Sequence, residues 1–133
     1  MSSVGGYNRE ELEKLVDKII EIDDGFCLCF LDIKDLREQD KNARYLSKEA
    51  MNQLVHNIRK EGHLESLPLC VFKKGKIYII SGHHRVRAAR LAGVKKVWVL
   101  LYTRDLSDDQ IKAKQLAHNA IQGVDDRSVL AEI

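Results

Sequence analysis

Residues 81–87 read Ser-Gly-His-His-Arg-Val-Arg, so a glycine is followed closely by histidines and arginines. An apolar segment precedes Ser81 and a helical pattern follows it, which predicts a strand-to-helix turn at Gly82. The start of a helix presents unpaired N–H groups and a partial positive charge, which favour a bound anion. Arg85 and Arg87 can form charge-assisted bonds to phosphate oxygens. A glycine turn followed by arginines also occurs as plain structure, so this pattern alone leaves both interpretations open.

The charge distribution points to the same part of the chain. The net charge is only +2, but no Asp or Glu occurs between Ser66 and Arg104. That stretch contains nine basic residues, whereas the segments on either side of it are acidic overall. A basic block between acidic flanks favours an anionic partner, either a nucleotide phosphate or nucleic acid. The alternative is that these charges are spread over several faces and are only solvated, which we prefer for the turn lysines at 73, 74 and 76.

The elements that must position this segment follow from apolar spacing and capping residues. Helices are expected from Asn8 to about Asp24, from Ser47 to Gly62, over 84–91 and from Ser107 onwards, the last with a capping box to Gln110. Strands are expected over 26–33, 69–72, 77–80 and 97–101, and an irregular loop over 34–44. Helices and strands of this order predict one α+β domain.

Length and composition agree with a single globular domain. The chain has 133 residues, of which 44% are hydrophobic and 32% charged. No apolar run approaches the length of a membrane span, and the start lacks an apolar signal core. Three cysteines without paired spacing disfavour a disulfide framework, and Cys27 and Cys29 are expected on one face of a strand. These features predict a cytoplasmic protein without a membrane partner.

The segment from Ser81 to Gly93 resembles the ParB signature GERRxRAAxxAG. Three further elements resemble parts of the same family in the same order: Asn42-Ala43-Arg44, the stretch from Gly62 to Val71, and His118-Asn119-Ala120-Ile121-Gln122, which is similar to the motif ENIQR. The resemblance covers roughly residues 26–126. It implies a ParB/sulfiredoxin-like fold, a small mixed β-sheet packed with helices. In this interpretation residues 1–25 are an N-terminal helical extension and residues 26–133 form the ParB-like domain.

The resemblance implies a nucleotide pocket of the CTP or ATP class, with magnesium as the ion that accompanies the triphosphate in the family. The residues implied as nucleotide or phosphate ligands are Arg44, Ser81, Gly82, His83, His84, Arg85, Arg87, His118 and Asn119. His83 and His118 stand where the two family motifs carry acidic residues. Because magnesium prefers oxygen ligands, this replacement disfavours a bound ion, and no metal site is predicted.

Alternative functions remain open from the sequence. A nuclease or phosphotransferase on the same scaffold would use His83 as a catalytic acid or base. A DNA-binding module without nucleotide would place the basic helix over 84–90 on backbone phosphates. The leading interpretation is a nucleotide-binding domain of a DNA-associated protein, by analogy from a phage or mobile element. The apolar stripe of the first helix is compatible with packing on the domain and with a homodimer, and the sequence leaves both open.

Overall fold

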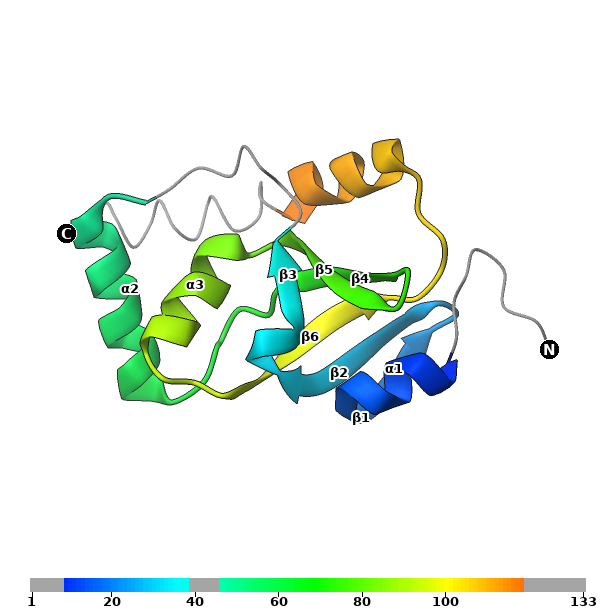
Figure 1. The fold of residues 1–133 in the computed structure, drawn as a ribbon. Coiled ribbons are helices and arrows are strands. Elements are labelled where there is room, and N and C mark those ends of the chain that lie inside the picture. Colours follow the sequence, from blue (N-terminus) through cyan, green and yellow to red (C-terminus); the bar gives the residue numbers. More distant parts are fainter. Residues whose placement is uncertain (1–8, 39–45, 119–133) are drawn as a thin grey trace.

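The computed structural model describes residues 9–38 and 46–118, which build a mixed β-sheet with helices packed on it (Figure 1). The strands are β1 (Val16–Asp23), β2 (Phe26–Asp32), β3 (Leu36–Glu38), β4 (Leu69–Lys73), β5 (Lys76–Ser81) and β6 (Lys96–Tyr102). The helices are α1 (Arg9–Leu15), α2 (Lys48–Glu61), α3 (His83–Leu91) and a helix over residues 108–118, and the 3-10 turn η2 (Ile33–Asp35) precedes β3. The predicted α+β class with a small mixed sheet is confirmed.

Within the described residues, the strands form one sheet in the order β1-β2-β6-β4-β5-β3. Strand β4 runs parallel to β6, and β3 runs parallel to β5, while the remaining neighbours are antiparallel. Strand β5 therefore lies between β4 and the short edge strand β3. This order matters for function because the candidate turn begins where β5 ends.

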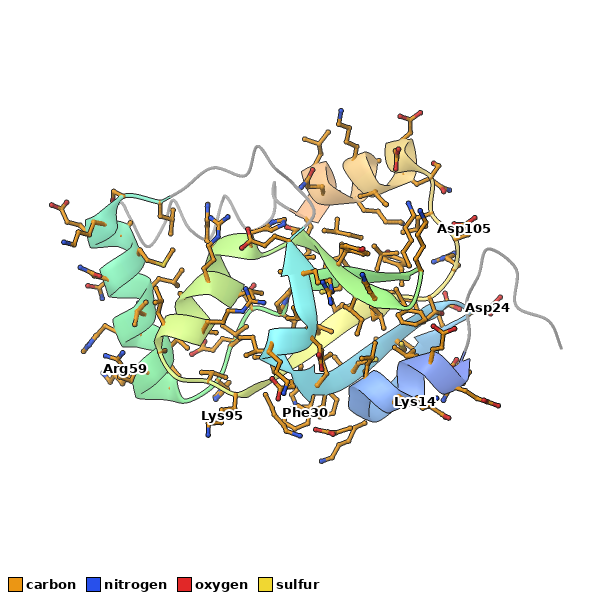
Figure 2. All side chains as sticks on the ribbon, viewed as in Figure 1. Lys14, Asp24, Phe30, Arg59, Lys95 and Asp105 are labelled. Carbon is orange, nitrogen blue, oxygen red and sulfur yellow. The ribbon has the colours of Figure 1, made fainter. Side chains whose placement is uncertain are left out.

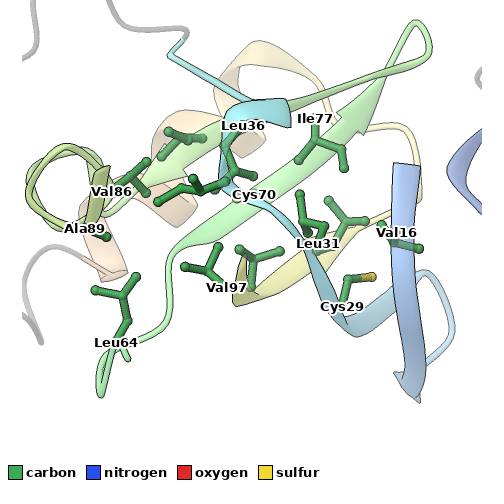
Figure 3. Packing of buried hydrophobic residues seen from close by; sticks show 14 of the residues in the cluster. Val16, Cys29, Leu31, Leu36, Leu64, Cys70, Ile77, Val86, Ala89 and Val97 are labelled. Carbon is green, nitrogen blue, oxygen red and sulfur yellow. The ribbon is translucent and has the colours of Figure 1, made fainter. Parts of the chain in front are cut away.

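The main core lies on one face of the sheet. Alternate residues of β2, namely Cys27, Cys29 and Leu31, are buried there and pair across to β6. Figure 3 shows Val86 and Ala89 of α3 packing toward the same cluster. Since successive side chains of a strand point to opposite faces, this pattern fixes the register of the central strands and the position of α3.

A second, smaller cluster covers the other face. Leu69, Val71 and Ile80 are buried together with Leu106, and Ile111 of the 108–118 helix packs against them. In Figure 1 this helix lies above β4 and β5. The cluster holds the 108–118 helix next to the end of β5.

The predicted helix caps at Ser47 and Ser107 are confirmed, whereas Asn8, the cap expected for the first helix, lies outside the described residues. The Ser47 hydroxyl accepts a hydrogen bond from the Ala50 N–H at 3.1 Å, and Gly62 ends α2 in the left-handed region with φ 82°. The Ser107 hydroxyl accepts from the Gln110 N–H at 3.2 Å, and the Gln110 side chain accepts from the Ser107 N–H at 2.8 Å. Reciprocal bonds of this kind satisfy N–H groups that a helix start leaves open.

The predicted helix from Asn8 to about Asp24 is wrong beyond Leu15. Val16–Asp23 is a strand, β1, that pairs antiparallel with β2 through a turn at Asp24 and Gly25. The segment contains the β-branched residues Val16, Ile19, Ile20 and Ile22, which favour a strand. The apolar positions that seemed to follow a helical period are split between a short helix and a strand, with a register shift between Val16 and Lys18.

The expected loop over 34–44 is also partly wrong. Ile33–Asp35 form η2, and Leu36–Glu38 form β3 parallel to β5. The Asp32 carboxylate accepts from the Lys34 N–H at 3.0 Å and caps the 3-10 turn. The remainder of that loop, which includes Arg44, lies outside the described residues.

Two further expectations from the sequence concern the placement of the cysteines on a strand and the absence of a membrane-spanning segment. Cys27 and Cys29 share one face of β2, with both side chains buried and their Sγ atoms 3.5 Å apart. The third cysteine, Cys70, is buried in β4. Along 9–38 and 46–118, the structure contains no helix with both the length and the apolar character that a membrane crossing needs.

Candidate functional site

The β5–α3 turn has a backbone that only glycine accommodates without strain. Ser81 ends β5 with 1% of its surface exposed, and Gly82 caps α3 at φ 101° and ψ 22°. A Cβ atom on Gly82 would lie 3.1 Å from Pro68 Cα. Both the positive φ and this approach require a missing side chain. The turn therefore brings α3 directly out of the buried end of β5, close against the backbone at Pro68.

The first turn of α3 carries no acidic residue, and His84 and Arg85 are half-buried within it. His83 is buried, with 8% of its surface exposed. A helix start with this composition concentrates positive charge and N–H groups at one place, which suits an anionic group. Basic residues here oppose the helix dipole, and a bound anion would offset that unfavourable placement.

The 108–118 helix lies against this turn on one side of α3. His118 Nδ1 lies 2.7 Å from Ser81 Oγ, and the Gln115 amide donates to the Ile80 carbonyl at 3.0 Å. Partial burial lowers the pKa of His118, and the positive charge of Arg85 lowers it further. His118 is 37 positions from Ser81 in the sequence, and it meets Ser81 and the charge of Arg85 at this turn.

The opposite side of α3 faces β3 and η2. The Arg87 guanidinium donates from Nε to Glu38 Oε2 at 3.2 Å, and its Nη2 bonds Glu38 Oε1. Arg90 Nη2 donates to the carbonyls of Ile33 at 3.1 Å and Leu36 at 2.6 Å. The hydrogen bond from Arg87 is the main cause that lowers the pKa of Glu38, and burial opposes it. These arginines fasten the edge strand to α3.

The structure thus brings most of the predicted residues together, although none of their roles as ligands is tested. Ser81, Gly82, His83, His84 and Arg85 form the turn and the helix start, and His118 lies beside them. Arg87 lies on the same helix, but its side chain is bonded to Glu38. Arg44 and Asn119 lie outside the described residues.

Two residues of the site were missed from the sequence, Glu38 and Gln115. Glu38 is 49 positions from Arg87, and its segment was expected to be loop. No local pattern signals this contact, because it depends on the pairing of β3 with β5. In the sequence, Gln115 is one polar residue among several in a predicted helix. Its hydrogen bond to the Ile80 carbonyl depends on how that helix packs on the sheet.

The donor set of the described site does not suit magnesium. Around the turn the side chains are imidazole, guanidinium and hydroxyl groups, and the nearby carboxylate of Glu38 is bonded to Arg87. Magnesium prefers oxygen ligands in octahedral geometry. Across residues 9–38 and 46–118, no group of three or more His, Cys, Asp and Glu side chains is arranged to hold a metal ion. The role of His83 as an acid or base remains a prediction.

The lowered pKa of His118 gives a pH prediction. Histidine in an unfolded chain titrates near 6.5, and the pKa of His118 in the folded domain is lower. Between these two pKa values the unfolded chain therefore binds more protons than the folded one. The stability that neutral His118 contributes is present above about pH 6.5 and is lost as pH falls through its folded-state pKa. We expect wild-type Tm to fall between about pH 7.5 and 5 more than that of His118→Gln. Equal Tm profiles for wild type and His118→Gln would contradict the prediction.

Comparisons with known proteins identify the family. The model of the ParB N-terminal domain matches residues 27–120. A probable chromosome-partitioning protein ParB of Coxiella burnetii is 35% identical over 77 residues, which are 57% of this chain and 25% of that protein. The chromosome-partitioning protein ParB of Myxococcus xanthus is 33% identical over 84 residues, which are 62% of this chain and 27% of that protein. The matched segment thus spans about a quarter of each curated relative.

Solved structures of ParB proteins share the fold of this chain. A C-terminally truncated chromosome-partitioning protein ParB from Caulobacter crescentus, complexed with CTP-gamma-S, superposes with a TM-score of 0.59 at 26% identity, covering 69% of this chain and 52% of that one. A Pnob8-like ParB-N domain superposes with a TM-score of 0.56 at 20% identity, covering 74% and 38%, and shows the fold alone. The family model covers well over half of the chain, and so the chain belongs to the ParB N-terminal domain family.

Proposed function

We propose that this domain binds a nucleotide of the CTP class, with its phosphates at the β5–α3 turn, as part of a DNA-associated protein. The observation that carries the proposal is the left-handed Gly82 turn, which opens a helix start without acidic residues directly beside Arg85. Backbone N–H groups at such a turn bind phosphate without competition from side chains, and Arg85 adds a charged donor.

The comparisons support the nucleotide and the DNA association. The Caulobacter crescentus ParB, which shares the fold at 26% identity, is complexed with CTP-gamma-S. The curated relatives are chromosome-partitioning proteins. Because the chain matches only about a quarter of those relatives, their activities as whole proteins stay proposals here. The proposal concerns binding, because the buried position of His83 favours a structural role over proton transfer at an exposed substrate.

The arginines of α3 lie on two sides of the helix, and this placement indicates which of them contacts a ligand phosphate at the turn. The charge of Arg85 acts on His118, which contacts Ser81, whereas Arg87 and Arg90 are bonded to β3 and η2. We therefore assign the main phosphate contact among the arginines to Arg85. Arg87 is paired with Glu38, so it can contact a phosphate only after that ion pair opens.

The test is calorimetric titration of the chain with CTP, ATP, GTP and inorganic phosphate, with and without magnesium. We expect saturable binding of CTP at a stoichiometry near one, with weaker binding of ATP, GTP and inorganic phosphate. Binding that is equal for all three nucleotides would leave a phosphate site without base selection and would contradict the CTP assignment. No binding of any of them would contradict the proposed function, and salt-sensitive binding of duplex DNA would then become the function to examine.

A further inference from the structure

The Glu38–Arg87 ion pair lies on the same helix as the proposed phosphate site, but on the side of α3 that contacts β3. Successive residues of an α-helix are about 100° apart, so Arg85 and Arg87 point to nearly opposite sides of α3. The interactions agree with this geometry. The charge of Arg85 lowers the pKa of His118, whereas Arg87 and Arg90 contact β3 and η2. The hydrogen bond from Arg87 is the largest cause of the lowered pKa of Glu38, and electrostatic contributions from Arg87, His83 and Arg90 add to it against the opposing effect of burial. One carboxylate thus faces the whole basic side of the helix.

The geometry of the pair is the one that an arginine uses for phosphate. Arg87 presents two nitrogens, Nε and Nη2, to the two oxygens of Glu38. The side chains are 17% and 31% exposed, so neither is sealed in the core. A phosphate group offers a guanidinium the same pair of parallel acceptors and carries more charge than a carboxylate.

The element that holds Glu38 is small. Strand β3 has three residues, lies at the edge of the sheet and pairs only with β5 among the described strands. Glu38 is its last residue and pairs with Ile79. Leu36, at the other end of β3, is buried and receives the bond from Arg90. Glu38 can therefore leave Arg87 while the start of β3 stays anchored.

We infer that the Glu38 carboxylate holds, in the ligand-free domain, the place of a ligand phosphate on Arg87. This inference rests on the proposed phosphate site at the β5–α3 turn. A polyphosphate that binds at Gly82 and Arg85 extends past the helix start, takes over the Arg87 guanidinium and releases the end of β3. A single phosphate group is too short to reach both sides of α3 and leaves the ion pair intact. Glu38 thereby sets how strongly the site distinguishes polyphosphate from phosphate.

The experiment compares the affinities of wild type and Glu38→Gln for CTP, inorganic tripolyphosphate and inorganic phosphate. Removing a competing charged acceptor should tighten tripolyphosphate and CTP binding roughly tenfold and should change phosphate binding much less. In the Arg87→Gln background the same Glu38→Gln change should have no effect, because the disputed guanidinium is gone. Asp17→Asn is the matched control, since it removes one carboxylate from the Lys96 ion pair on another part of the sheet.

A second readout keeps the test independent of folding losses in the Arg87 variant. The Arg87 Nε–H resonance of the wild type should shift on addition of tripolyphosphate and stay in place with phosphate. If the wild type binds CTP but Glu38→Gln binds no tighter, or gains equally without Arg87, the inference is overturned while the proposed function stands. If neither the wild type nor Glu38→Gln binds CTP or tripolyphosphate, both are overturned.

Discussion

Alanine at position 82 is expected to lower the free energy of unfolding by about 2–4 kcal/mol, the largest stability change predicted for a single residue of the site. Gly82 has φ 101°, where a side chain is strained, and its Cβ would lie 3.1 Å from Pro68 Cα and 3.3 Å from Pro68 Cβ. These atoms belong to a backbone segment that leads into β4, so they cannot move aside cheaply. Chemical denaturation at constant pH measures the change.

Gly93 provides the matched control for this prediction. It also has a positive φ, 86°, but no atom lies within 4 Å of the position its Cβ would take. Gly93→Ala should therefore show only the penalty of the left-handed backbone, about 1 kcal/mol. The excess loss in Gly82→Ala measures the approach to Pro68. Equal losses in the two variants would show that this approach does not constrain the turn.

Arg85→Ala is expected to weaken nucleotide binding on the order of a hundredfold, with little loss of stability. Two charge-assisted hydrogen bonds to phosphate are each worth about 1.5 kcal/mol or more, and the half-buried side chain packs in no cluster of the core. The variant should also raise the pKa of His118, because the charge of Arg85 contributes to its lowering. Calorimetry gives the affinity, and an NMR titration of the imidazole gives the pKa.

Arg59→Ala serves as the control for charge alone. Arg59 lies in the last turn of α2 and donates to the Leu91 carbonyl at the far end of α3 (Figure 2). Its removal lowers the net charge by the same amount without touching the turn. If Arg85→Ala and Arg59→Ala bind nucleotide with the same affinity, whether unchanged or reduced, Arg85 is not the specific phosphate ligand that the site requires.

Local signals in the sequence were sufficient for the part of the fold that carries the turn. Ser47 and Ser107 predicted two helix starts, and Gly62 marked a helix end, because capping depends on neighbouring residues alone. The apolar run before Ser81 predicted β5, and the glycine after it predicted the turn into α3. The site residues from Ser81 to Arg85 follow directly from that arrangement.

Strand β1 could not be separated from α1 by apolar spacing, because Leu12, Leu15, Val16 and Ile19 fit both a helix and the start of a strand. Its identity comes from pairing with β2, which depends on contacts across the hairpin. The Asp24-Gly25 sequence is a hairpin signal in itself, and Gly25 has φ 74° there. Weighing that signal above the apolar spacing would have predicted the hairpin.

The partners of α3 could not be predicted because they come from distant segments. Arg87 and Arg90 are separated from Glu38 and Leu36 by about fifty residues, and the contacts exist only because β3 runs parallel to β5. The sequence therefore presented α3 as one uniformly basic helix. In the structure its arginines are divided between a site at the turn and an ion pair with the edge strand.

The most direct test of the central claim is an NMR titration of the ¹⁵N-labelled chain with CTP, which reports where the phosphates lie. The account predicts that the backbone amide signals of Gly82, His83 and His84 shift most and in proportion to occupancy, with the Arg85 Nε–H signal following them. Inorganic tripolyphosphate should reproduce these shifts, because the turn binds the phosphates rather than the base. Saturable shifts centred on other residues, with the amides of the β5–α3 turn unchanged, would contradict the account.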